Sequence, residues 1–235
     1  MKKLITLICI LLCAASVLVS CKKTQPHKSA KPGPEKITTV LIDRTMPPAS
    51  VESRTSAFAG VSAVYPKIKN TNTDGLINER IEKRLLDFAS EYGTLISNIT
   101  YDIKYNDHGV LSILFSAKSN ETSVMLYLPV NFNTAGGEEI TLSSLFNKKD
   151  TAWRDAAALY INTQAKLRNL ETHSEFTLER DKSFYLTDTA LVIIYEMYEV
   201  TYASAGSPAF GIPYGVLKDH ISDNGAIDVI LSYQN

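Results

Sequence analysis

The placement of the cysteines constrains how this chain can fold. All three cysteines of the 235-residue sequence, Cys9, Cys13 and Cys21, lie within its first 21 residues. The rest of the chain therefore offers no disulfide, no thiolate nucleophile and no cysteine ligand for a metal. With 45% hydrophobic residues, a domain of roughly 200 residues can be stable through packing alone.

The first 21 residues have the order of a secretion signal. Two lysines precede an apolar stretch from Leu4 to Val19, and the small Ser20 stands before Cys21. The run Leu18-Val19-Ser20-Cys21 resembles the lipobox of bacterial lipoproteins. That resemblance implies lipidation of Cys21, an extracytoplasmic location, and a lipid anchor in the outer membrane or the cell membrane. Two or three acyl chains, at about 0.8 kcal/mol per buried CH₂, make a durable anchor.

An uncleaved transmembrane helix is the alternative interpretation of this stretch. Its 16 residues fall short of the roughly 20 that a membrane span needs. We therefore expect residues 1–20 to be a cleaved signal peptide, residues 21–37 a lipidated tether, and residues 38–235 the folded domain. A division of that domain into two closely packed halves, about 38–132 and 133–235, remains open.

Charge is unevenly distributed along the chain. Residues 22–36 carry five lysines and one glutamate, so this tether would favour anionic lipid headgroups at about 1 kcal/mol per lysine, or serve as a solubilising linker. Residues 37–235 carry 17 basic and 24 acidic residues, a net charge of −7. The acidic balance argues against nucleic acid as a partner and favours a basic one.

Apolar periodicity and turn residues predict an α+β fold, in which an antiparallel β-meander sheet or sheets pack against two main helices, with a short C-terminal helix in addition. Helices are expected at 74–92, 150–168 and 214–221. Strands are expected, in chain order, at 37–43, 57–65, 99–105, 110–117, 123–132, 139–142, 183–186, 190–200 and 226–233.

Several finer expectations follow from the same patterns. Asn72 or Asp74 can cap the first helix, and Leu167 is expected on the apolar side of the second. Residues 191–194 are apolar on both faces, which predicts a central strand. A Gly/Pro loop is expected over residues 204–213.

The order of these elements resembles a known family: the extracytoplasmic domain shared by the lysozyme-binding anti-sigma factor RsiV and the N-terminal region of the peptidoglycan deacetylase PdaC. The resemblance implies a ligand such as lysozyme or peptidoglycan. The chain departs from the family pattern in two places. Residues 119–122 lack the Gly-Gly-Ala-His type turn of many members, and Thr201 stands where the family favours proline. The stretches that carry the resemblance are Val64-Tyr65-Pro66-Lys67-Ile68, Ile77-Asn78, residues 140–146, residues 184–193, Tyr202-Ala203-Ser204-Ala205-Gly206 and Ile212-Pro213-Tyr214.

No catalytic, metal-binding or cofactor-binding pattern stands out in the sequence. His108, His173 and His220 lack the spacing of metal ligands and are expected at the surface. A Gly-x-Ser-x-Gly elbow is absent. Gly206 and Gly211 are spaced as in a phosphate-binding loop, but no lysine follows them, so we interpret them as turn residues.

The aromatic residues of the C-terminal half offer the candidates for binding. Most tyrosines at strand or helix spacing are expected in the core. Tyr202 and Tyr214 flank the Gly/Pro loop and are better candidates for an exposed contact surface, because recognition concentrates on loops held by a rigid sheet. The predicted partner-binding residues are therefore Tyr202, Ser204, Gly206 and Tyr214.

These observations favour a lipid-anchored, non-enzymatic binding module of the cell envelope for a protein or glycan ligand. An envelope hydrolase whose site assembles only on folding is one alternative, and convergent carboxylates with a buried histidine in a polar cleft would favour it. A structural or assembly lipoprotein is another, which a large exposed apolar patch would favour.

Overall fold

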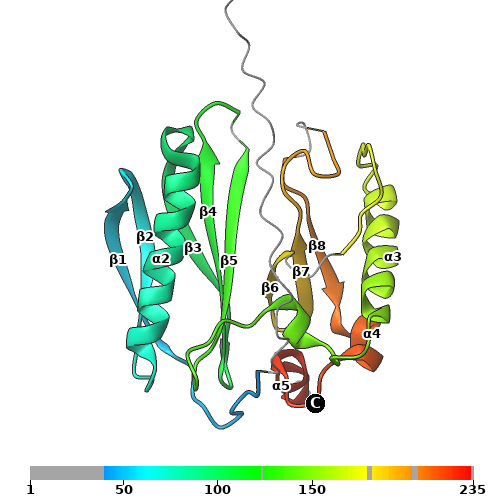
Figure 1. Cartoon of the computed structure of the whole chain (residues 1–235), viewed down its shortest axis with the longest axis horizontal. Helices are drawn as coiled ribbons and strands as arrows, with labels where there is room; N and C mark the ends of the chain where they lie inside the picture. Colours follow the sequence, from blue (N-terminus) through cyan, green and yellow to red (C-terminus); the bar gives the residue numbers. More distant parts are fainter. Residues whose placement is uncertain (1–39, 123, 179–181, 203–205, 234–235) are drawn as a thin grey trace, which may run out of the picture. The chain divides into compact units, whose positions relative to one another are not determined.

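The computed structural model describes residues 40–122, 124–178, 182–202 and 206–233, all within one compact unit, Ile37–Asn235. The expected α+β class is confirmed: within these ranges, eight strands form one five-stranded and one three-stranded sheet, with helices packed against both (Figure 1). None of the helices in the described ranges has both the length and the apolar character needed to cross a membrane.

The larger sheet has the strand order β1-β2-β3-β4-β5. The β3–β4–β5 meander lies close to its expected position, but the sheet is mixed rather than antiparallel. After β2 the chain crosses over through α2, so β3 pairs with β2 in parallel. The bounds are β1 Ser50–Phe58, β2 Val61–Lys69, β3 Ile96–Asp107, β4 Val110–Ser119 and β5 Met125–Asn133.

The N-terminal strands differ from the sequence expectation. No strand occupies residues 40–43, where Ile42 instead donates its backbone N–H to the carbonyl oxygen of Asn224 at 3.2 Å. The expected single strand at 57–65 is the hairpin β1–β2. Pro66 lies inside β2. In the described residues, β2 pairs with β3 only through Ser62 and Ala63, so at Pro66 the edge of β2 that faces β3 needs no backbone N–H for a hydrogen bond.

Helix α2 (Asp74–Tyr92) has the expected bounds and covers one face of the larger sheet (Figure 1). Its buried apolar side chains are Ile77, Ile81, Leu85, Phe88 and Ala89. The expected cap is wrong: Thr73 occupies the N-cap position without capping the helix, and its hydroxyl donates a hydrogen bond of 2.7 Å to the carbonyl oxygen of Thr134. This contact ties the start of α2 to the chain beyond β5.

The smaller sheet consists of β6 (Ser183–Leu186), β7 (Ala190–Ile194) and β8 (Ala209–Pro213), with β7 in the centre as predicted. The Gly/Pro loop was expected to extend to residue 213, but its last five residues form β8, and Gly211 is a strand residue rather than a turn residue. The phenylalanine and isoleucine of β8 are fully buried, which explains why this stretch completes the sheet.

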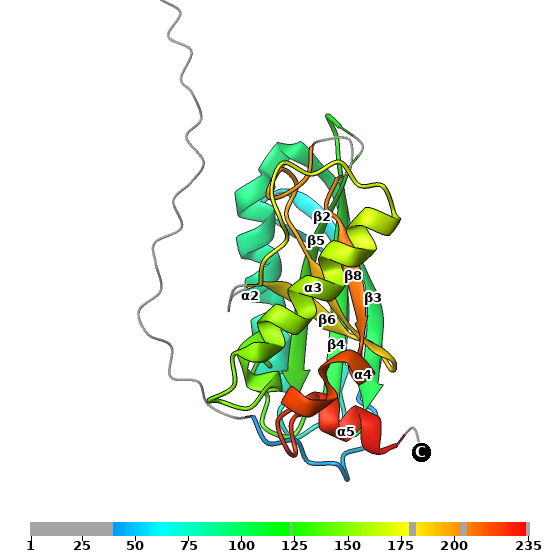
Figure 2. The same cartoon turned by 90° about the vertical axis from the view of Figure 1, so that its right-hand side faces the viewer.

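Helix α3 (Ala152–Leu167) covers the smaller sheet on the side away from the larger one (Figure 2). Trp153, Ala157, Ile161 and Ala165 are buried along its inner face. The expectation that Leu167 lies on this apolar side is wrong, because 71% of its surface is exposed.

From Tyr214 to Tyr233 the chain is mainly helical. The short helix expected at 214–221 is present as α4 (Tyr214–Leu217), continued by the 3₁₀ turn η4 (Lys218–His220). The expected last strand is instead the helix α5 (Ala226–Ser232), whose buried side chains include Ala226 and Ile230, four residues apart. A short apolar run fits both the periodicity of a helix and that of a strand, so the sequence pattern alone could not distinguish the two at residues 226–233.

The strand expected at 139–142 is reduced to a single bridge between Glu139 and Phe132, followed by the 3₁₀ turn η2 (Leu142–Leu145). A further 3₁₀ turn, η1 (Gly93–Leu95), links α2 to β3.

Candidate functional site

A groove of about 190 Å³ lies where the two sheets meet, at the carboxyl end of β7. We refer to it as the intersheet groove. Its walls come from the end of α2, the start of β5, the start of β6 and the chain that follows β7. The lining residues are Tyr92, Leu126, Tyr127, Ser183, Ile194, Tyr195, Glu196, Met197 and Ser207.

The tyrosines of the groove are held in partly or fully desolvated positions. Burial raises the pKa of Tyr92 to about 12, and the nearby carboxylates of Glu91 and Glu196 act in the same direction. Burial also raises the pKa of Tyr195, whose hydroxyl donates a hydrogen bond of 2.8 Å to the carbonyl oxygen of Thr177. Both phenols therefore stay neutral near neutral pH and act as aromatic walls.

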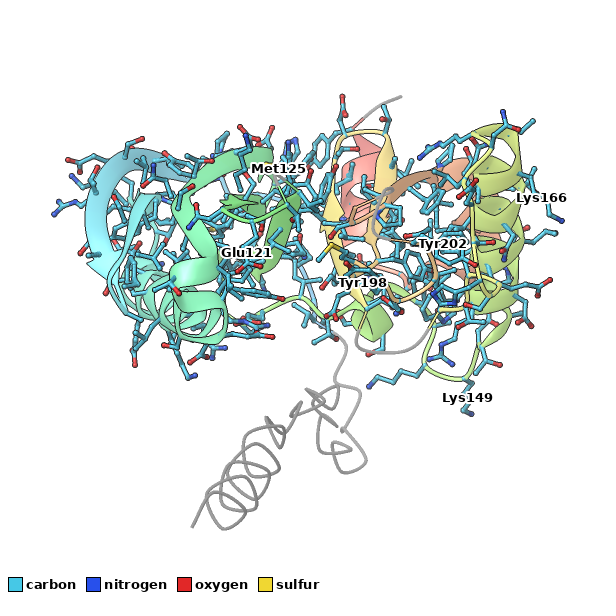
Figure 3. All side chains as sticks on the ribbon, turned by 90° about the horizontal axis from the view of Figure 1, so that it is seen from above. Glu121, Met125, Lys149, Lys166, Tyr198 and Tyr202 are labelled. Atoms are coloured by element: carbon cyan, nitrogen blue, oxygen red, sulfur yellow. The ribbon has the colours of Figure 1, made fainter. Side chains whose placement is uncertain are left out.

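Beside the groove, the loop after β7 presents two exposed tyrosines. Tyr198 and Tyr202 have 57% and 52% of their surfaces exposed. Figure 3 views the domain from this end and shows both tyrosines across from Glu121 and Met125, which belong to the β4–β5 side. We call Tyr198, Tyr202 and the adjacent His173 the tyrosine rim.

The backbone of the rim is fixed by local contacts. Tyr198 has a φ of +68°, a left-handed conformation that bulky side chains rarely adopt and that is found where surrounding contacts impose it. His173 supplies such contacts. Its Nε2 lies 3.2 Å from the carbonyl oxygen of Tyr198, and its ring meets the ring of Tyr202 edge-on, with centroids 5.8 Å apart. The rim thus presents aromatic surface from a constrained loop.

The structure brings together some of the residues predicted for binding and separates others. Tyr202 is exposed, and Gly206, with a φ of +64°, lies next to Val124. Cys21 and Ser204 lie outside the described residues. Tyr214 is only 2% exposed, so the expectation of an exposed contact there is wrong. Its hydroxyl donates a 2.7 Å hydrogen bond to the carbonyl oxygen of Thr187.

Sequence reasoning did not single out Tyr198, Tyr92 or Tyr127. A usable signal for Tyr198 was present in Glu196 and Glu199, because acidic residues within an apolar run indicate where the chain leaves the core. The strand expected at 190–200 ends at Ile194, so the tyrosine between these acids leaves the core. Tyr92 and Tyr127 lie far apart in sequence, and only the fold brings them into one groove.

The expected surface histidines form no joint site. His108 lies in the β3–β4 turn, and His220 pairs with Asp150, with Nδ1 and Oδ2 2.5 Å apart. Within the described ranges, histidine, aspartate and glutamate side chains form no group of three that could hold a metal ion.

A larger depression of about 380 Å³ runs along the solvent face of α2. Four of its six charged side chains pair with one another, Lys83 with Asp87 at 2.6 Å and Arg84 with Glu139 at 2.9 Å, and the other two, Glu79 and Arg80, carry opposite charges. Mutually neutralised, exposed ion pairs offer a ligand little. We therefore place the candidate site at the intersheet groove and the tyrosine rim despite the smaller volume.

Comparison with known proteins concerns this same part of the chain. Residues 143–215 match the family model of a protein of unknown function, DUF3298. The match includes α3, the smaller sheet and the tyrosine rim. No curated protein matches the chain.

Two crystal structures of DUF3298 family proteins share the fold. One, from Bacteroides fragilis NCTC 9343, is 12% identical with a TM-score of 0.51, and the alignment covers 78% of this chain and 96% of that one. The other, from Pseudomonas aeruginosa PAO1, is 13% identical with a TM-score of 0.56, covering 77% of this chain and 97% of that one. At this identity the likeness concerns the fold alone, and the closer resemblance to the RsiV and PdaC domains remains a prediction.

Proposed function

We propose that this protein is a lipid-anchored, non-enzymatic binding module of the bacterial cell envelope, and that the tyrosine rim and the intersheet groove contact its ligand. The observation that carries the proposal is the pair of tyrosines that are more than half exposed on a loop constrained by His173. Tyrosines supply much of the binding energy in protein interfaces, and a constrained loop loses little entropy on binding.

The position of the rim supports an anchored receptor. The first described residues lie beside Asn224, near α5, whereas the tyrosine rim follows the opposite end of β7 (Figure 1). A domain attached through a tether at its N-terminus would then carry its ligand-contacting end away from the point of attachment. This arrangement suits a module that captures a ligand from the envelope space.

Lysozyme and peptidoglycan are the ligands we propose to test first, following the sequence resemblance. Exposed tyrosine rings suit both, since they can stack on sugars and can serve as anchors in protein interfaces. The net charge of −7 over residues 37–235 attracts a basic protein through electrostatic steering, which favours lysozyme over peptidoglycan.

A binding measurement with matched variants tests the proposal. Residues 38–235 are immobilised and titrated with lysozyme and, separately, with soluble peptidoglycan fragments. Tyr202→Ala is expected to weaken binding at least tenfold, as at a hot-spot tyrosine, whereas Leu167→Ala, which removes an exposed side chain from α3, leaves the Kd unchanged. If neither ligand binds the unmodified domain, the proposed ligands are wrong.

The anchor is tested separately from the ligand. The intact mass of the native protein is expected to show loss of residues 1–20 and addition of acyl chains at Cys21. Cys21→Ala should move the protein from the membrane fraction to the soluble fraction. A native mass that retains residues 1–20 without acyl groups would contradict the lipid anchor.

A further inference from the structure

We propose that the intersheet groove accepts one lysine or arginine side chain of a protein partner. The inference rests on the proposed function, because it names the chemistry that the same site recognises. It combines three properties of the groove: its size, its aromatic walls and its uncompensated negative charge.

The size of the groove fits a single anchoring side chain. Pockets for small-molecule ligands typically measure about 300–1,000 Å³, and this groove measures about 190 Å³. It is therefore too small for an extended glycan or a cofactor. A single long side chain that projects from a partner is the kind of group that such a depression can enclose.

The walls suit the stem and the head of a basic side chain. Leu126, Ile194 and Met197 supply apolar surface for methylene groups, and Tyr92 and Tyr127 supply ring surface. Aromatic faces attract ammonium and guanidinium groups, and long basic side chains bury their stems on apolar surface while the charge stays near water.

The charge at the mouth of the groove is negative. Glu196 lines the groove, and Glu91 lies close enough to affect Tyr92. In the described part of the chain, no cation pairs with the carboxylate of Glu91 or of Glu196. This distinguishes the intersheet groove from the depression on α2, where acids and bases neutralise one another.

The chain itself shows the same chemistry next to the groove. The ammonium group of Lys182 lies 4.8 Å from the ring centroid of Tyr195 and also pairs with Glu199. A lysine held between a tyrosine ring and a glutamate is the arrangement that we propose for the partner's side chain, with Tyr92 or Tyr127 as the ring and Glu196 as the acid.

The test uses the full-length protein in non-ionic detergent and small probes observed by saturation-transfer difference NMR. N-acetyl-arginine amide is compared with N-acetyl-citrulline amide, which has nearly the same shape but no charge. The arginine probe is expected to bind at least fivefold more tightly, and the difference should shrink as salt is raised. Glu196→Gln should remove most of this preference. Glu175→Gln, an exposed acid on another loop, should leave it unchanged.

The outcomes separate this inference from the proposed function. Equal affinity for both probes, or a preference that survives Glu196→Gln, overturns the basic-anchor inference even if lysozyme or peptidoglycan binds at the tyrosine rim. Tighter binding of N-acetylglucosamine than of the arginine probe also overturns it, in favour of a sugar subsite. A Glu196-dependent arginine preference supports the inference even if neither proposed ligand binds, in which case only the ligand identity fails.

Discussion

The side-chain amide of Asn131 in β5 donates a hydrogen bond of 2.9 Å to the backbone carbonyl oxygen of Phe184 in β6. The hydroxyl of Ser112 donates to Asn131 Oδ1 at 2.7 Å and accepts the backbone N–H of Leu186 at 2.9 Å. Among the strands of the described residues, β6 is an edge strand that pairs only with β7. Ser112 and Asn131 therefore satisfy the free edge of β6 in place of a neighbouring strand and join the two sheets.

Asn131→Ala is expected to lower the free energy of unfolding by about 1–3 kcal/mol, because it leaves buried backbone and hydroxyl groups without partners. Urea unfolding followed by circular dichroism measures the change. Asn98→Ala, at an exposed position of β3, serves as the control and should change the stability by less than about 0.5 kcal/mol. Equal effects of the two variants would show that the hydrogen bonds between the sheets contribute no net stability.

The pair of Asp150 and His220 predicts a specific dependence of stability on acid. The hydrogen bond from His220, followed by the backbone N–H of Ala152, holds the pKa of Asp150 below its ordinary value of 3.8. A carboxyl group with a lowered folded-state pKa stabilises the protein above its ordinary pKa, and that contribution is lost as the pH falls through the lower folded value.

Asp150→Asn is therefore expected to lower the free energy of unfolding near pH 7 and to make that free energy less sensitive to acid. The free energies of unfolding of the variant and of the unmodified protein should then converge below about pH 4. Urea unfolding at a series of pH values measures this, with the fluorescence of Trp153, the only tryptophan, as the signal. Asp223→Asn, at an exposed position, should leave the pH profile unchanged. A constant difference between Asp150→Asn and the unmodified protein down to pH 2 would rule out this linkage.

The β3–β4 turn requires glycine at one position. Gly109 has a φ of +81°, and a Cβ atom there would lie 2.6 Å from the carbonyl oxygen of Asp43. Gly109→Ala is expected to destabilise the fold by about 1–3 kcal/mol through backbone strain and this clash. Gly215→Ala, where a Cβ would meet nothing within 4 Å, should be neutral or slightly stabilising. Thermal unfolding compares the two, and a similar melting temperature for both variants would contradict the steric argument.

How far the sequence could predict this fold depended on the length of each pattern. Helix α2 was predicted with its bounds because nineteen residues repeat one amphipathic face. Helix α5 has only seven residues, and its apolar pattern fits both a helix and a strand, so the sequence predicts a strand there. The glycine and proline of β8 predict a loop, although the burial of Phe210 and Ile212 makes this stretch a strand.

The candidate site was predictable only in part, for a related reason. Tyr202 could be identified because local Gly/Pro chemistry marks the loop beside it. Tyr214 has the same local context, yet the fold buries it against the smaller sheet. The intersheet groove could not be predicted, because its walls come from α2, β5, β6 and β7, and no single segment contains its pattern.

The two faces of α3 provide a test of its orientation. Ile161 is fully buried and Leu167 is 71% exposed. Ile161→Ala is expected to cost about 2–5 kcal/mol, as for other large-to-small core substitutions, whereas Leu167→Ala should stay within about 0.5 kcal/mol. Denaturant unfolding measures both. A larger loss from Leu167→Ala would mean that the helix presents its other face to the sheet.

Backbone-amide NMR of residues 38–235 during titration with lysozyme or soluble peptidoglycan fragments tests the central claim most directly. Our account predicts that the largest shifts map to the tyrosine rim and the intersheet groove, at Tyr198, Tyr202 and residues 194–197, with smaller shifts at residues 126–127. Saturable shifts confined to the opposite end, around Arg44, His108 and Tyr233, would contradict the assignment of the binding site.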